Sequence, residues 1–203
     1  MSTTTSPRAA GGWTRAGFLR AALGGGAVAA GGIAIGARGG STEASPSRST
    51  DLEILNVFLA LEYAQEDFYR AALDTDAIDH SLREYATAAA AQEREHIALL
   101  RKHLGSRARA HQQVDTGDAV RSPQRFRTAA IHLEEAAIGA YIGQAANLTG
   151  AMVAAIAPLV SVEARQAAWI RNLAGVAPAP DAADPGRRGE AVISDLRSRG
   201  LIA

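Results

Sequence analysis

Four glutamates and one histidine stand at positions where helical periodicity places the apolar side of the chain. They are Glu62, Glu93, His96, Glu134 and Glu163. Glu93 and His96 are three residues apart, so one helix would present both on the same face. Carboxylate oxygens and imidazole nitrogens are the ligands by which proteins without thiolates bind divalent metal ions. The residue types and their spacing therefore predict a metal site assembled from several helices.

Each of the four glutamates interrupts an apolar stripe near its middle, which is a costly position for a carboxylate. A buried carboxylate without a partner either destabilises the fold or becomes protonated and gives up its charge. One such group could be satisfied by a hydrogen bond, whereas four at one level need cations. Two divalent ions would balance the four charges. The alternative is a polar network left over from an ancestral metal site.

Four segments with helical periodicity would carry these residues. They run from about 51 to 73, 81 to 104, 123 to 148 and 151 to 173. Cap and first-turn residues, or a glycine just past the last turn, mark several of the ends. These signals are Thr50-Asp51, Ser122-Pro123, Gly105 and Gly175. Pro158 lies inside the fourth pattern, where it predicts a kink or a later helix start.

The lengths of the connections predict the topology. A short loop at about 74–80 joins the first two helices, and the last two meet near Thr149-Gly150. The connection 105–122 is too long for a tight turn between the second and third helices. We therefore expect an all-α four-helix bundle of two helical hairpins joined by a long crossover. The segment 176–189 is expected to be a loop, and 190–202 a short tail helix.

The two halves of this region repeat one pattern. The stretch LEYAQEDFYRAAL echoes LEEAAIGAYIGQA, and each contains a glutamate followed seven residues later by a tyrosine. The pairs are Glu62 with Tyr69 and Glu134 with Tyr141. A tyrosine two turns along the same face can donate a hydrogen bond near a ligand. The domain thus reads as a repeated helical hairpin.

The region from about 51 to 176 resembles the ferritin-like superfamily. The similarity is strongest to exported bacterial ferritin-like domain proteins, which are related to plant desiccation-related proteins. The matching stretches are LALEYAQEDFYRAAL, AAQEREHIALLRKHL, LEEAAIGAYIG and VEARQAAWIRNLAG. The resemblance implies a ferritin-like four-helix bundle with a di-iron or di-manganese carboxylate centre.

The resemblance also implies a role for each residue. Glu62 and His96 would hold the first metal, Glu134 would hold the second, and Glu93 and Glu163 would bridge the two.

One position departs from the pattern of the family. Gln166 stands where the resemblance places a second histidine. An amide oxygen is a poorer ligand for iron than an imidazole nitrogen. Gln166 therefore predicts a second metal site that is weaker than the first.

Composition excludes several classes of function. The sequence has no cysteine, which excludes disulfides, thiolate metal sites and cysteine nucleophiles. Its 21 basic and 21 acidic residues give a formal net charge of zero, and no basic stripe indicates a nucleic-acid partner.

The first 37 residues have the composition of an export signal. Three arginines without an acid precede the uncharged stretch AALGGGAVAAGGIAIGA, after which cleavage at Ala37 is expected. The segment TRAGFLR is similar to a twin-arginine signal but has Ala16 in place of the second arginine. Both the twin-arginine and the general secretion route therefore stay open, and so does an uncleaved membrane anchor. Residues 38–50 are expected to form a flexible linker and 177–203 a C-terminal tail.

Two functions from different classes fit these observations. The first is an exported metal protein that reacts Fe(II) with oxygen or peroxide. The second is a metal-free or singly metallated bundle with a structural or stress-protective role at the cell envelope. A homo-oligomeric storage cage is a further option, which sizing would test.

Overall fold

The computed structural model describes residues 46–201, and all statements below refer to this part of the chain. The expected export signal and the cleavage site after Ala37 lie outside it. The described residues form five α-helices and three short 3-10 turns, without a strand. None of these helices is long and apolar enough to span a membrane.

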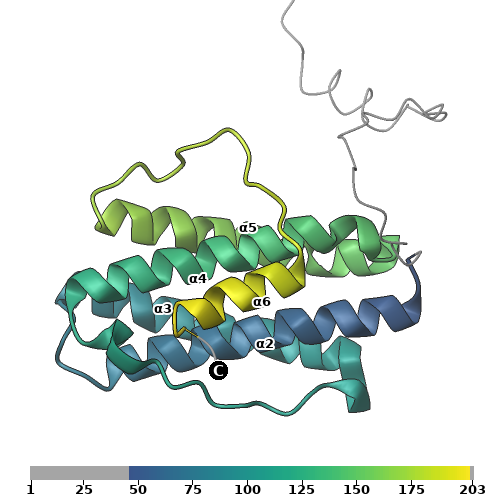
Figure 1. The fold of residues 1–203 in the computed structure, drawn as a ribbon, viewed down its shortest axis with the longest axis horizontal. Coiled ribbons are helices and arrows are strands. Elements are labelled where there is room, and N and C mark those ends of the chain that lie inside the picture. The colour runs from purple at the N-terminus through teal and green to yellow at the C-terminus, as the bar shows by residue number, and fades with distance from the viewer. Residues whose placement is uncertain (1–45, 202–203) are drawn as a thin grey trace, which may run out of the picture. The chain divides into compact units, whose positions relative to one another are not determined.

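Four long helices form the expected bundle of two hairpins (Figure 1). The first hairpin pairs α2 (Arg48–Leu73) with α3 (His80–Leu104), and the second pairs α4 (Pro123–Gln144) with α5 (Gly150–Leu173). The crossover contains the turns η1 (Gly105–Arg107) and η2 (Gly117–Val120) and runs along the length of the bundle. The all-α fold class and the crossover are thereby confirmed.

The helices α2, α3 and α4 each begin at a side chain that accepts a hydrogen bond from a free backbone N–H group. Ser122 caps α4 ahead of Pro123, as predicted. Asp79 caps α3 by accepting from Leu82 N at 3.0 Å. The cap of α2 is Ser47, not Thr50-Asp51, so this helix begins three residues earlier than expected and shortens the predicted linker. Asp51 instead accepts hydrogen bonds from the backbone and side chain of Thr149, which ties the two hairpins together.

Two boundaries in the second hairpin differ from the predictions. The helix α4 ends at Gln144 rather than at Leu148, because the turn η3 (Ala145–Asn147) reverses the chain before α5. Leu148 follows this turn and is still buried, which explains why it continued the apolar pattern. Pro158 lies inside α5, which begins at Gly150 and continues past the proline. The prediction that Pro158 marks a later start of this helix was therefore wrong.

Polar side chains of α2 fix the crossover to the bundle. Asn56 donates to Arg107 O and accepts from Arg109 N, at 3.1 and 2.8 Å. Asp67 is buried and accepts from Val114 N and His111, at 2.8 and 2.9 Å. His111 thus has a structural role in the crossover. The crossover is thus held at two points along α2.

The core combines small and aromatic side chains. Alanines on α3 and α4 allow close helix contact, while Phe58 and Phe126 are completely buried. Burial of a side chain of this size stabilises a fold by roughly 1.5–3 kcal/mol. Phe126 packs against the rings of Tyr69 and Tyr85, which brings both phenols into the middle of the bundle. The core thereby places polar hydroxyls at the level of the glutamates.

A fifth helix, α6 (Gly189–Ser198), packs on α4 and α2 (Figure 1). Its residues Val192 and Leu196 are completely buried. The chain reaches this position by passing close to Gly139 and Gly143 of α4, where Arg187 N donates to Gly139 O at 2.7 Å. The predicted tail helix is therefore present and covers one side of the bundle.

Candidate metal centre

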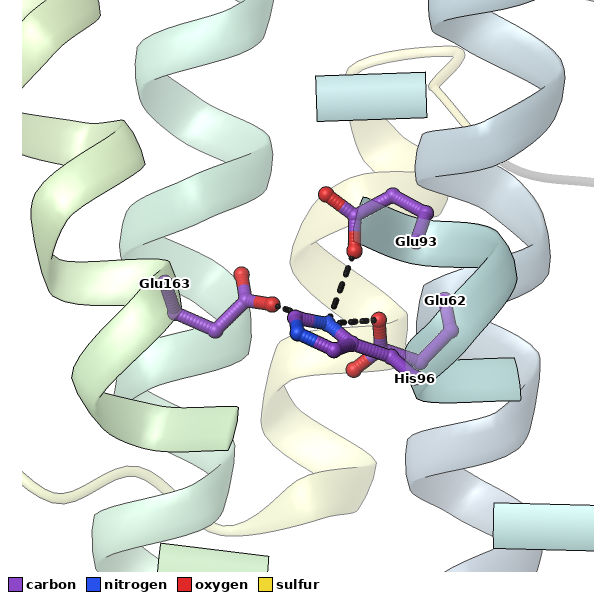
Figure 2. A group of neighbouring side chains, drawn as sticks. All are labelled: Glu62, Glu93, His96 and Glu163. Atoms are coloured by element: carbon purple, nitrogen blue, oxygen red, sulfur yellow. Dashed lines mark hydrogen bonds and ion pairs between the residues drawn. The ribbon is translucent and has the colours of Figure 1, made fainter. Parts of the chain in front are cut away.

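Four of the predicted ligands meet in the core. Glu62 comes from α2, Glu93 and His96 come from α3, and Glu163 comes from α5 (Figure 2). All are buried, and each offers a ligand atom within 4.8 Å of the others. Because three separate helices supply them, the bundle must be folded before the group exists. This group could hold a metal ion.

The geometry of the four side chains centres on His96 Nδ1. This nitrogen lies 3.1 Å from Glu62 Oε2, 3.0 Å from Glu93 Oε2 and 2.9 Å from Glu163 Oε1 (Figure 2). Adjacent ligands of an octahedral ion bound at about 2.1 Å are about 3.0 Å apart. Each of the three oxygens therefore lies as far from the nitrogen as two adjacent ligands of one ion would lie from each other.

Several of these oxygens lack a hydrogen-bond donor. Both oxygens of Glu93 and Oε1 of Glu163 are buried without a well-oriented partner. His96 Nδ1 carries at most one hydrogen, so it cannot satisfy three carboxylates. Unpaired buried carboxylate oxygens are costly, and a cation is the partner that would satisfy all of them. The donor set thus fits a divalent ion.

The electrostatics of the cluster point the same way. Burial, together with the neighbouring carboxylates, raises the pKa of Glu93, Glu134 and Glu163. Burial lowers the pKa of His96, but the carboxylates of Glu163, Glu62 and Glu93 around it outweigh this and raise the pKa to about 12. Without a cation the cluster must therefore retain protons, and an ion that binds there must displace them.

The other two predicted ligands lie beside this group rather than in it. Glu134 is completely buried and accepts hydrogen bonds from Tyr69, Tyr85 and Gln65. Gln166 is buried as well, but its amide donates to Gln92 Oε1 at 2.8 Å. The six predicted residues are therefore close neighbours, of which four converge on one point.

A comparison with known families agrees with this arrangement. The family model of the ferritin-like domain matches residues 50–176. The chain belongs to the ferritin-like domain family. No curated protein matches the sequence.

The repeated tyrosines of this ferritin-like bundle bond across the two halves. Tyr141 of α4 donates to Glu62 of α2, and Tyr69 of α2 donates to Glu134 of α4. Burial raises the pKa of both phenols, with the carboxylates adding to the shift, so they remain donors. The prediction of a tyrosine donor near a ligand was right, although each tyrosine serves the glutamate of the other half.

Three residues of the site were not predicted from the sequence. Gln65 donates to both Glu134 and Glu163, and Tyr85 donates to Glu134. Gln92 accepts from Gln166. The available signal for Gln65 was its spacing of three residues from Glu62, which places both on one helix face. Glu66 itself is buried, and it pairs at 3.8 Å with arginines that are exposed.

A surface groove lies beside His96. It lies between α3 and α5, has a volume of about 740 Å³ and includes His96 in its lining. Its lining includes the apolar residues Ala98, Leu99 and Val162. Lys102 adds a positive charge. The groove is therefore a route by which small molecules could reach the buried ligands.

Proposed function

We propose that this chain is an exported ferritin-like protein that binds iron or manganese in its core and oxidises Fe(II) with oxygen or peroxide. The observation that carries the proposal is the set of unpaired oxygens on Glu93 and Glu163 around His96 Nδ1. Ferritin-like proteins often bind iron, which supports the same metal here. The resemblance also implies a second ion, which Glu134 and Gln166 would hold.

The residues around the centre would each contribute a simple task. Glu62, Glu93, His96 and Glu163 would hold the ion, and Tyr141 orients Glu62 through its hydrogen bond. A bound iron or manganese ion would supply the redox chemistry with oxygen or peroxide. The surrounding core limits water, while the groove beside His96 admits a small oxidant.

Export is the second part of the proposal, and the composition of the first 37 residues supports it. A basic stretch precedes a short uncharged one, and small residues follow at the expected cleavage position. We expect the mature protein to begin after Ala37. Mass spectrometry of the protein from the cell envelope or medium should give the mass of the chain without residues 1–37. A full-length chain found in the cytoplasm would contradict export.

The test of metal binding compares one double variant on α3 and α5 with a surface control on α3. The double variant Glu93→Gln/Glu163→Gln keeps the side-chain volumes but removes two negative charges, so it should lose the bound metal and the Fe(II) oxidation. The control Glu84→Gln removes an exposed carboxylate from α3 and should change neither quantity. Metal content and oxidation rate that are equal in both variants and the wild type would contradict the proposal.

A metal-free structural role is the second candidate, and the hydrogen bonds of Glu134 favour it. Three neutral donors satisfy this carboxylate without any cation. A scaffold of this kind would fold cooperatively and melt at a temperature that does not depend on iron or manganese. A metal protein, in contrast, would gain about 2.7 kcal/mol at a metal concentration one hundred times Kd. Thermal melting with and without metal separates the two candidates.

A further inference from the structure

The amide of Gln65 lies between two carboxylates of the cluster. Its Nε2 is 3.3 Å from Glu134 Oε2 and 3.1 Å from Glu163 Oε2. An amide NH₂ has two hydrogens, so Gln65 can donate one to each glutamate. Gln65 is almost completely buried and contacts two glutamates of the cluster, so it belongs to the site. The amide bridges the two carboxylates in the way that a cation would.

These donations leave Glu134 without need of an ion. Its Oε2 accepts from Gln65, and its Oε1 accepts from the hydroxyls of Tyr69 and Tyr85. Glu93, by comparison, accepts no well-oriented hydrogen bond on either oxygen. The unsatisfied charge is therefore concentrated on the His96 side of the cluster.

Gln166 brings only a neutral amide to the other side of the cluster. Its Nε2 donates to Gln92 at the edge of the groove, and its Oε1 is buried without a partner. Glu134 is missing from the group of acidic and histidine side chains whose ligand atoms converge. The side of the cluster that the resemblance assigns to a second ion thus has a carboxylate that neutral donors already satisfy and only the neutral amide oxygen of Gln166 beside it.

We propose that the bundle holds a single divalent ion and that the Gln65 amide takes the place of a second one. The inference rests on the proposed metal binding and specifies its stoichiometry. Glu62, Glu93, His96 and Glu163 hold the ion, and Glu163 accepts from Gln65 with its remaining oxygen. Glu134 is stabilised by hydrogen bonds from neutral donors.

The experiment measures how many Mn(II) ions bind to the purified full chain, by calorimetric titration and by elemental analysis. The wild type should bind one ion. Gln65→Ala removes the bridging amide, frees Glu134 Oε2 and Glu163 Oε2, and leaves room for an ion with its waters, so it should bind two. Gln124→Ala removes an exposed amide from α4 and should bind one ion like the wild type. Electron paramagnetic resonance adds a second readout, because an isolated Mn(II) ion and a coupled pair give different spectra.

The outcomes separate this inference from the function on which it rests. Two ions in the wild type would overturn the inference while leaving metal binding intact. No ion in the wild type would overturn both. One ion in the wild type and two in Gln65→Ala would support the inference. One ion or fewer in a folded Gln65→Ala variant would show that the amide does not replace an ion, and would overturn it.

Discussion

The carboxylates of the cluster carry raised pKa values, and this links the stability of the metal-free protein to pH. Burial raises the pKa of Glu93, Glu134 and Glu163 above the ordinary value of 4.5. The folded protein then binds more protons than the unfolded chain as the pH rises above 4.5. His96 acts in the same direction, since the carboxylates around it outweigh burial and raise its pKa from 6.5 to about 12. Stability from these groups is present at low pH and lost as the pH rises.

We therefore expect the metal-free protein to melt at a lower temperature at pH 8 than at pH 5.5. Metal should reverse the trend, because an ion replaces the protons and binds more tightly as the pH rises. Thermal melting at both pH values, with and without Mn(II), checks this. The variant Glu93→Gln/Glu163→Gln serves as the control and should show a smaller dependence on pH. A melting temperature of the metal-free protein that increases toward pH 8 would contradict this assignment.

Tyr141 is the residue whose removal tests the hydrogen bonds of the centre. Tyr141→Phe deletes the hydroxyl that donates to the buried Glu62. Hydrogen bonds to charged groups contribute about 1.5–3 kcal/mol, so the free energy of unfolding of the metal-free protein should fall by about that amount. Tyr63→Phe is the matched control on α2, because its hydroxyl accepts from Arg101 near the surface. Equal losses of stability in the two variants would show that the bond to Glu62 has no special weight.

At the scale of helices, the glycines of α4 determine how the C-terminal segment docks. A Cβ at Gly143 would overlap with the backbone of Arg187. Gly143→Ala should therefore displace Arg187 and loosen α6, exposing Val192 and Leu196. We expect a lower melting temperature and faster proteolytic cleavage near residues 176–188. Gly150→Ala is the control, since its Cβ would meet no atom within 4 Å. Unchanged proteolysis in Gly143→Ala would contradict the close packing at this position.

The groove between α3 and α5 leads to a prediction about rates. Val162 lines it and is half-buried, so Val162→Phe should narrow the path to His96. Fe(II) oxidation should slow several-fold, while the amount of metal bound at equilibrium stays the same. Val153→Phe is the control on the same helix, because Val153 is half-buried but does not line the groove. If the two variants oxidise Fe(II) at the same rate, small molecules reach the centre by a route other than this groove.

Helix positions and most signals at their ends could be predicted because they depend on local spacing, although the cap of α2 is Ser47 rather than Thr50-Asp51. Ser122 with Pro123, and the glycines Gly105 and Gly175, mark helix ends as expected. Leu148 misled the prediction because a buried residue after a 3-10 turn continues the apolar period. Local patterns thus fix the elements, but not the turns that reverse the chain between them.

The site was predictable only as far as residue types and helix faces define it. Glu93 and His96 share a face by spacing, and the structure brings them together with Glu62 and Glu163. The partners across helices could not be derived, because they depend on which neighbour each side chain meets. Tyr69 thus bonds to Glu134 of the other hairpin.

At the scale of the whole molecule, folding and metal binding are coupled, because the ligands come from three helices of both hairpins. The crossover and α6 hold these hairpins together without contributing a ligand. A variant that separates the hairpins should therefore lose the site as a unit. The balance of charges also favours a cation in the core, since buried carboxylates outnumber the single histidine there.

The most direct test of the central claim is a crystal structure of the protein grown with iron or manganese, with anomalous scattering measured at the absorption edge of the metal. We predict one strong peak among Glu62, Glu93, His96 and Glu163, within bonding distance of His96 Nδ1. No peak in the bundle, or a peak only at the surface, would contradict metal binding in the core.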